Sequence, residues 1–395
     1  MDYIYHLSWI TDTVAGWLEG PLPGWLAFVI LGLLGTVGVL MFVVPSLLIV
    51  IYIERKLIGR FQIRIGLSRT GPHGLLQPIA DAVKVLAKED IIPKNADKLV
   101  FLIAPTAAFV PAVLVWATIP LAQDLHLTDL DIGILYIVAV SSLSVIGIFM
   151  AGWASNNKYS LFGAMRTIAQ MISYEVPVVL SLVAVLMITG SLSLVSIVDR
   201  QTVPFLLLQP VGFLLFFIAS LAEINRSPLD LLEAEQEIVA GFHTEYSGFR
   251  FSIFYLVEYT HALTMGALIT VVFLGGWNFF GTWLSGSFVP QYIWFAGKVY
   301  LVFAVLVWIR ATMPRLRVDQ LMDFGWKTLV PIALANIFIT GFGVLAFPDN
   351  DLLIAVFGWV PVVVALLWLR FRQGTVERGG QEAVALPGYQ PSPAK

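Results

Sequence analysis

The chain has 395 residues, of which 58% are hydrophobic and 12% charged, with a formal net charge of −3 and a mean hydropathy of +0.85. Soluble chains are about 45–50% apolar and about 25% charged, so a soluble fold of this size cannot bury so much apolar surface. These values exclude a soluble enzyme, a nucleic-acid-binding protein and an outer-membrane barrel, whose strands are alternating segments of about 10 residues.

Nine runs of residues with few or no charges predict nine membrane-spanning helices. Each span must be helical because lipid offers no hydrogen-bond partner to a free backbone group. We therefore expect an all-α polytopic helical membrane protein. It would have a single transmembrane domain over 1–373 and a disordered cytoplasmic tail, rich in Gly and Pro, over 374–395. In chain order the predicted spans are 25–53, 99–121, 132–152, 167–189, 204–222, 252–274, 292–310, 328–348 and 352–369.

Lysine and arginine are distributed unevenly between the loops that join these spans. Arg200 is in a loop on one side and Lys298 lies within a span, while the other 21 of the 23 basic residues share the opposite side. Those 21 fall in 54–98, 153–166, 223–251, 310–327 and the tail from residue 370. Because basic residues favour the cytoplasmic side, the count predicts an N-terminus outside and a C-terminus in the cytoplasm.

The loop after the first span contains a predicted amphipathic helix over residues 75–88. Its apolar residues are spaced three or four positions apart, and its charged residues lie elsewhere on the helical circle. The apolar positions are Leu75, Leu76, Ile79, Val83 and Leu86. The pattern is typical of a helix that lies in the plane of the membrane interface, and a simply solvated surface helix is the alternative.

The loop 223–251 is acidic, with six carboxylates against two basic residues. On a helix, Asp230, Glu233 and Glu237 would share one face. Leucine, isoleucine and valine residues interleave with the acids, which indicates partial burial. Crowded carboxylates near lipid raise one another's pKa, so such groups can take up protons near neutral pH. A solvated acidic loop is the alternative interpretation.

Two further acids, Glu175 and Glu258, lie inside the fourth and sixth predicted spans. A carboxylate inside a membrane costs about 2.5–3.5 kcal/mol on insertion scales, which makes a functional role the default hypothesis. Glu258 could instead be a structural partner. It also forms, with His261, half of the Glu-x-x-His pattern of a di-iron site, but such a site needs a second copy and two more glutamates.

The chain contains no cysteine, so it has no disulfide, no cysteine-ligated iron–sulfur cluster and no covalently attached haem. Its five histidines are scattered, and only His261 lies inside a long apolar run. We therefore expect any redox centre to be in another chain.

Several motifs resemble one family closely over residues 28–346. The motifs are GPHGLLQPIADA at 71–82 with Lys88-Glu89, GWASNNKYSL at 152–161, ISYE at 172–175, EINRSPLD at 223–230 with GFHTEYSG at 241–248, and WIRATMPRLRVDQLM at 308–322. On these motifs the chain is similar to the H-type membrane subunits of the proton-pumping NADH:quinone oxidoreductase, respiratory complex I.

The resemblance implies a tunnel for the quinone tail, formed by the first span, the amphipathic helix and the sixth span. It also implies a line of buried acids that couples quinone reduction to proton translocation. By position, the residues along the quinone path would be Arg55, Arg64, Asp81 and Arg226. Those of the proton path would be Glu175, Glu223, Asp230, Glu233, Glu235, Glu237 and Glu258.

The same resemblance implies the surroundings of the chain. Its partners would be the other membrane-arm and peripheral-arm subunits, in a bacterial-type inner membrane. Quinone would be the substrate, and FMN, iron–sulfur clusters and the NADH site would belong to partner subunits. No redox centre is expected in this chain itself.

The chain departs from the family pattern at four positions and in its number of spans. It has Leu67-Ser68 where the family usually has Pro-Asn, Leu229 in place of Phe, and Ile146 where Tyr is common. The span 352–369 is additional to the usual eight. The alternatives are the related membrane module of an energy-converting hydrogenase, an autonomous proton or ion channel, and a passive membrane anchor.

Overall fold

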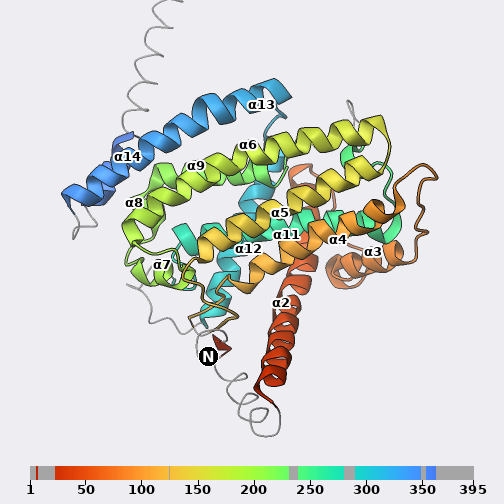
Figure 1. Cartoon of the computed structure of the whole chain (residues 1–395), viewed down its shortest axis with the longest axis horizontal. Helices are drawn as coiled ribbons and strands as arrows, with labels where there is room; N and C mark the ends of the chain where they lie inside the picture. Colours follow the sequence, from red (N-terminus) through yellow and green to blue (C-terminus); the bar gives the residue numbers. More distant parts are fainter. Residues whose placement is uncertain are drawn as a thin grey trace, which may run out of the picture.

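The computed structural model describes residues 6–7, 23–123, 125–230, 239–279, 290–347 and 353–361, and these are mainly helical (Figure 1). The elements of the first half are β1 (His6–Leu7), α2 (Gly24–Phe61), η1 (Pro72–Gly74), α3 (Gln77–Leu86), α4 (Lys98–Leu114), η2 (Val115–Ala117), β2 (Leu125–His126), α5 (Gly133–Ala154) and α6 (Lys158–Thr189). The second half contains α7 (Leu194–Arg200), α8 (Phe205–Leu208), α9 (Pro210–Glu223), η3 (Gly241–His243), α11 (Gly248–Phe273), α12 (Gln291–Thr312), α13 (Val318–Phe324), η5 (Gly325–Leu329) and α14 (Val330–Ala346).

Within these described ranges, seven helices are long and apolar enough to cross a membrane, which confirms a polytopic helical membrane protein. They correspond to the first four predicted spans and to the sixth, seventh and eighth. The only strand pairing described is the two-residue antiparallel contact of β1 with β2. The described part of the ninth span, 353–361, is helical, and the rest of that span and the tail 374–395 lie outside the described residues.

The fifth predicted span is a broken helix. α8 and α9 are separated at Gln209, whose backbone angles are not helical. α9 has 14 residues and is therefore about 21 Å long, shorter than a hydrocarbon core of about 30 Å. The break is possible because the Gln209 side chain bonds to Thr340 and Asn336 of α14, which keeps the polar groups there satisfied.

Three helices extend beyond the predicted spans at their charged ends. α2 continues to Phe61, α6 begins at Lys158, and the last long helix begins at Val318 as α13 and passes through the π-helical turn η5 into α14. The sequence pattern ended these spans at the first charges. A helix can nevertheless continue where its charged side chains reach the interface or pair with one another.

α11 is the central helix of the bundle. In its most apolar window of 18 residues, 89% of the residues are buried, against 28–50% in the other six long helices. The helices around it approach closely at small residues, as is usual in membranes. A Cβ atom on Gly147 of α5 would lie 2.4 Å from the backbone nitrogen of Ala108 in α4, so only glycine permits this contact.

The bundle has two distinguishable ends (Figure 1). α3 and the start of α4 lie at one end, called the α3 end below, and α7 and α8 lie at the other, called the α7 end. α2 leaves the bundle at a steep angle to α4, α5 and α6 (Figure 1). α3 lies within the predicted amphipathic segment 75–88, and the five predicted apolar side chains are all exposed on this chain.

Candidate functional site

The innermost part of the site is a buried group of three charges at the α3 end. Glu54, near the end of α2, is only 2% exposed. Its Oε1 accepts a hydrogen bond of 2.7 Å from Nη1 of Arg226 and a second from Nη1 of Arg310. The group joins α2, the loop after α9 and the end of α12. Removing one member of a buried ion pair leaves the others uncompensated, so the three depend on one another.

The Arg226 cation has further partners on α11. The centre of its guanidinium lies 4.5 Å from the ring centroid of Tyr259, a favourable cation–π distance. Burial by itself lowers the pKa of Arg226. Glu54, Tyr259 and Glu258 together outweigh burial and hold the pKa above its ordinary value. Arg226 is therefore a permanent positive charge inside the protein.

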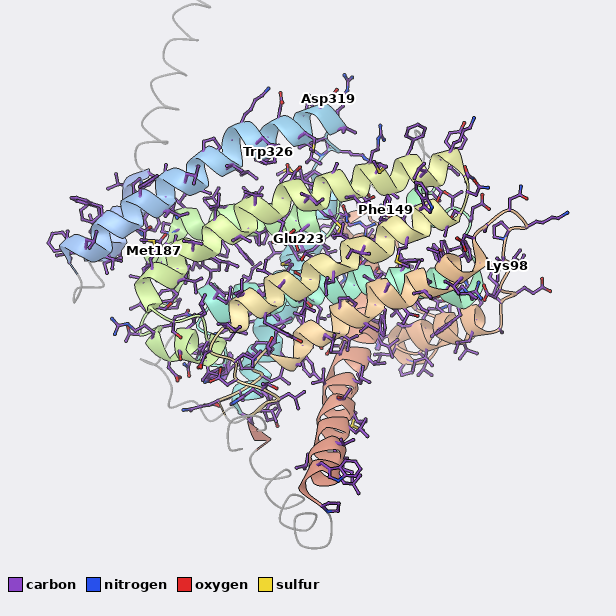
Figure 2. All side chains as sticks on the ribbon, viewed as in Figure 1. Lys98, Phe149, Met187, Glu223, Asp319 and Trp326 are labelled. Carbon is purple, nitrogen blue, oxygen red and sulfur yellow. The ribbon has the colours of Figure 1, made fainter. Side chains whose placement is uncertain are left out.

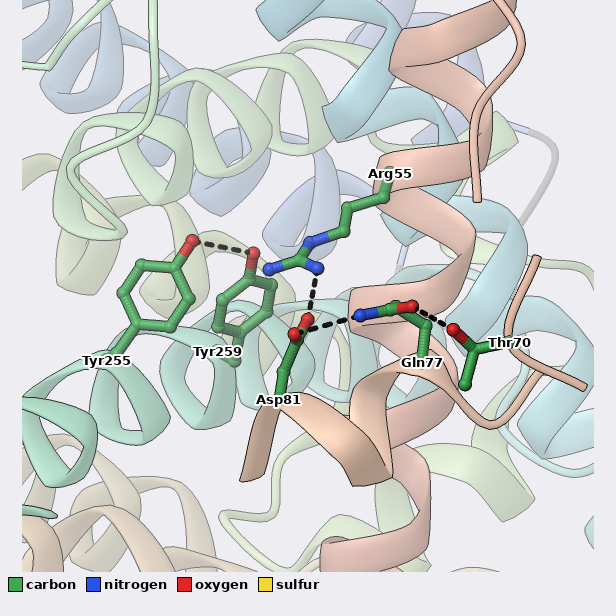
Figure 3. Close-up of polar contacts among 6 residues, drawn as sticks. All are labelled: Arg55, Thr70, Gln77, Asp81, Tyr255 and Tyr259. Atoms are coloured by element: carbon green, nitrogen blue, oxygen red, sulfur yellow. Dashed lines mark hydrogen bonds and ion pairs between the residues drawn. The ribbon is translucent and has the colours of Figure 1, made fainter. Parts of the chain in front are cut away.

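A second polar group lies between α2 and α3 (Figure 3). Arg55 donates a hydrogen bond to Asp81 of α3, and Asp81 also accepts one of 3.1 Å from Gln77. Burial by itself raises the pKa of Asp81, but the hydrogen bonds from Gln77 and Arg55 and the nearby positive charges lower it below its ordinary value. On α11, the hydroxyls of Tyr255 and Tyr259 are 3.4 Å apart (Figure 3).

The carboxylates of Glu175 and Glu223 form a third group, deeper in the bundle. Figure 2 shows Glu223 in the interior, between Lys98 at the α3 end and Met187 at the α7 end. The two glutamates line one cavity of about 10 Å³, about the space that one water molecule needs. Glu223 is 9% exposed, and its Oε2 has no hydrogen-bond partner among the described residues.

Three predicted residues are described but lie apart from these groups or have other contacts. Asp230 is half-buried directly after the loop that contains Arg226, and Glu258 is half-buried on α11. Both take part in interactions within the chain. Arg64 is exposed after the end of α2, where its Nε donates to Oε1 of Gln62 at 2.7 Å.

Glu233, Glu235 and Glu237 lie outside the described residues. The predicted face of Asp230, Glu233 and Glu237 therefore stays a prediction. In the part of the chain that is described, no group of three or more His, Cys, Asp or Glu side chains could hold a metal ion. Glu258 and His261 have no such group around them, so nothing in those ranges supports the di-iron alternative.

The departure at Leu67-Ser68 affects a loop that is held by backbone contacts. Lys56 donates to the carbonyl oxygens of Leu67 and His73, at 2.6 and 3.0 Å. Gly74 has a φ of +84°, and a Cβ there would lie 2.6 Å from the Leu67 carbonyl carbon. Because the carbonyl of Leu67 makes the contact, its side chain can change without loss of the loop.

Sequence reasoning missed Glu54, Arg310 and Tyr259 as members of the site. Glu54 and Arg310 are the charges that end two apolar runs, and that position was the available signal. Tyr259 adjoins Glu258 in an apolar span and had no signal of its own. The pairing of Glu54 with residues 172 and 256 positions away required the tertiary structure.

The fold and these buried charges define a multi-pass α-helical membrane protein with an ionisable site at one end of its bundle. The family model described as NADH dehydrogenase matches residues 34–341, and the chain belongs to this family.

Its relatives agree over most of the sequence, and the three compared here are all named as the H-type subunit of NADH-quinone oxidoreductase. The protein of Dehalococcoides mccartyi (strain CBDB1) is 58% identical over 332 residues, which are 84% of this chain and 92% of that protein. The protein of Geobacillus sp. (strain WCH70) is 51% identical over 323 residues, 80% of this chain and 95% of that protein. The protein of Carboxydothermus hydrogenoformans is 48% identical over 320 residues, 81% of this chain and 91% of that protein.

Proposed function

We propose that this chain is the membrane subunit of a proton-translocating NADH:quinone oxidoreductase that admits the quinone tail and couples quinone reduction to proton movement. The relatives are named as subunits of that complex, which favours it over a hydrogenase module, a channel or an anchor. NADH oxidation, FMN and iron–sulfur clusters would then belong to partner subunits. The exposed apolar face of α3 would contact lipid or a partner subunit.

The quinone tail would enter between α2, α3 and α11. Arg55 and Asp81 hold α3 against α2, and the exposed apolar residues of α3 suit an isoprenoid tail. Arg64 would flank the opening at the end of α2. Arg226, held by Glu54, would provide a fixed positive charge at the inner limit of this path.

The observation on which the proposal depends is a series of buried ionisable groups that starts at α3. It passes from Asp81 and Arg55 to Glu54 and Arg226, and then to Glu223 and Glu175, which share a cavity inside the bundle. A carboxylate that can be neutral as well as charged inside a membrane can relay protons. Asp230, Glu258 and the acids at 233, 235 and 237 would extend this path.

The test replaces Glu223 or Glu175 with glutamine, which keeps size and hydrogen bonding but cannot titrate. We expect Glu223→Gln to lower quinone-coupled NADH oxidation and proton pumping severalfold. Oxidation by an artificial acceptor that takes electrons from the peripheral arm should not change. The measurement is the ratio of these two activities in membranes with matched amounts of complex.

The control is Asp323→Asn, because Asp323 is exposed and pairs only with Lys327 four residues on. It should leave the ratio unchanged. A normal ratio and full pumping in both glutamate variants would show that these acids are structural.

A further inference from the structure

One buried amide fixes the loop that contains most of the site. Gln170 of α6 is fully buried, and its Nε2 donates hydrogen bonds to the carbonyl oxygens of Ala222 and Leu229, at 2.7 and 2.6 Å. Both acceptors are carbonyls, so the amide orientation is fixed by the contacts themselves. One side chain thus ties together two points of the chain that are seven residues apart in sequence.

These two points adjoin the ionisable residues of the loop. Ala222 directly precedes Glu223, and Leu229 directly precedes Asp230. Between them, Arg226 makes the ion pair with Glu54. A shift of the Gln170 amide would therefore move both carboxylates relative to the buried arginine.

The loop has only local backbone bonds of its own between these points. Arg226 accepts from the Leu229 N–H at 2.9 Å, and Asn225 adopts a φ of +54°, which an L side chain rarely adopts. From outside the loop, the N–H of Leu316 donates to the Pro228 carbonyl at 3.0 Å. Gln170 is the buried side chain that fixes both ends.

The neighbouring turn of α6 makes a similar contact. Tyr174, four residues after Gln170 and on the same buried face, donates from its hydroxyl to the Leu321 carbonyl at 2.8 Å. α6 thus places the loop through Gln170 and α13 through Tyr174. Glu175, the acid that shares a cavity with Glu223, is the next residue of the same helix.

We propose that Gln170 is a positioning residue for the coupling reaction. Its side-chain amide sets the distance of Glu223 from Glu175 and the point from which Asp230 and the following acids extend. The contact is made to backbone carbonyls, so the departure at Leu229 from the family pattern leaves it intact. This inference rests on the proposed function, because the loop matters only if its carboxylates and arginine take part in turnover.

The test is Gln170→Met, which keeps a similar volume and removes the donor. We expect kcat for quinone reduction to fall roughly tenfold, since a misplacement of about 1 Å can cost about 10²-fold in rate. The KM for quinone should change little, because Arg226 keeps its bond to Glu54. Activity with an artificial acceptor, measured in the assembled complex, should not change. Gln170→His restores one donor and should recover part of the lost kcat.

The matched control is Gln201→Met. Gln201 is also fully buried and donates from Nε2 to a backbone carbonyl, that of Val271 at 2.7 Å, but it lies at the α7 end. It should lower the yield of complex without changing the ratio of the two activities. Equal ratios in Gln170→Met and the parent, or an equal fall in Gln201→Met, would overturn the inference.

The failure of this inference can be told from failure of the proposed function. If Glu223→Gln and Glu175→Gln have no effect, the proton-path proposal fails. If Gln170→Met then raises the KM for quinone instead of lowering kcat, the positioning role remains but acts through Arg226. If Gln170→Met does not assemble, the Gln170→His variant decides, because a merely structural role predicts a normal ratio in it.

Discussion

The two ends of the bundle satisfy their buried polar groups in different ways. At the α3 end, Glu54, Arg226 and Glu223 are buried ionisable groups, and only some of their polar atoms have partners among the described residues. At the α7 end the buried groups are neutral amides, such as Gln201, which donates to the Val271 carbonyl. Neutral hydrogen bonds of this kind are what helices in a membrane ordinarily use to associate.

The buried lysine of the α7 end fits the same contrast. Nζ of Lys298 donates to the carbonyl oxygens of Leu274, Gly276 and Asn278, which follow the last turn of α11. All three of its donors are used, and the positive charge lies at the negative end of the helix dipole. The α7 end thus shows how this fold stabilises polar groups. The buried carboxylates of the α3 end are not needed for that purpose, which favours a functional role for them.

The largest expected effect comes from breaking the charge group at the α3 end. Glu54→Leu leaves Arg226 and Arg310 uncompensated, and the loss of one partner from a buried pair costs about 3–5 kcal/mol. We expect much less assembled complex and a lower Tm. The double variant Glu54→Leu/Arg226→Met should be more stable than Glu54→Leu alone, yet equally inactive with quinone. Equal stability of both variants and the parent would contradict the buried pairing.

The corresponding change at the α7 end is Lys298→Met. It removes charged hydrogen bonds to three carbonyls, at a cost of about 1–3 kcal/mol, and leaves no unpaired charge. We expect a smaller fall in Tm and a normal ratio of quinone-coupled to artificial-acceptor activity. A selective loss of quinone activity in this variant would remove the contrast between the two ends.

A smaller effect on stability is expected at the rim of the α3 end. Asp81→Asn breaks a partly exposed pair with Arg55, which is worth at most about 1 kcal/mol. The KM for quinone should nevertheless rise severalfold, because α3 is less firmly held against α2. An unchanged KM in membranes with matched complex content would show that this pair does not shape the quinone path.

The pH dependence of α3 docking follows from the direction of the Asp81 shift. Its pKa is lowered, so its contribution to docking is complete above the ordinary value of 3.8 and is lost as the pH falls through the lower folded value. Hydrogen exchange of α3 should differ between Asp81→Asn and the parent at neutral pH. The two should converge in strong acid.

The smallest perturbation tests which end faces the cytoplasm. The chain has no cysteine, so a single introduced thiol is the only one present in the chain. Asp131→Cys, in an exposed loop on the predicted outside, should react with an impermeant thiol reagent applied to intact cells. Lys94→Cys, exposed near the α3 end, should react only in inverted vesicles. The reverse pattern would overturn the predicted orientation.

The sequence was sufficient for the class of fold and for part of the site. Long apolar runs predict spans because every such run must bury its backbone polar groups in a helix, and seven of the nine are seen as long helices. It could not show that Gln209 breaks the fifth span, because the partners that make the break tolerable, Asn336 and Thr340, are 127 and 131 residues away. The charged ends of α2 and α6 were also placed too short, since local hydropathy falls where the helix itself continues.

By itself, the sequence determined the membrane class, the family and the individual acids that are costly to bury, such as Glu175. These follow from composition and from motifs, which are properties of consecutive residues. Only the tertiary structure decided that Glu54 pairs with Arg226 and Arg310 and that Glu175 shares a cavity with Glu223. It also revealed Gln170, because a neutral amide within a span has no local signal. Its importance lies in the two distant carbonyls that it joins.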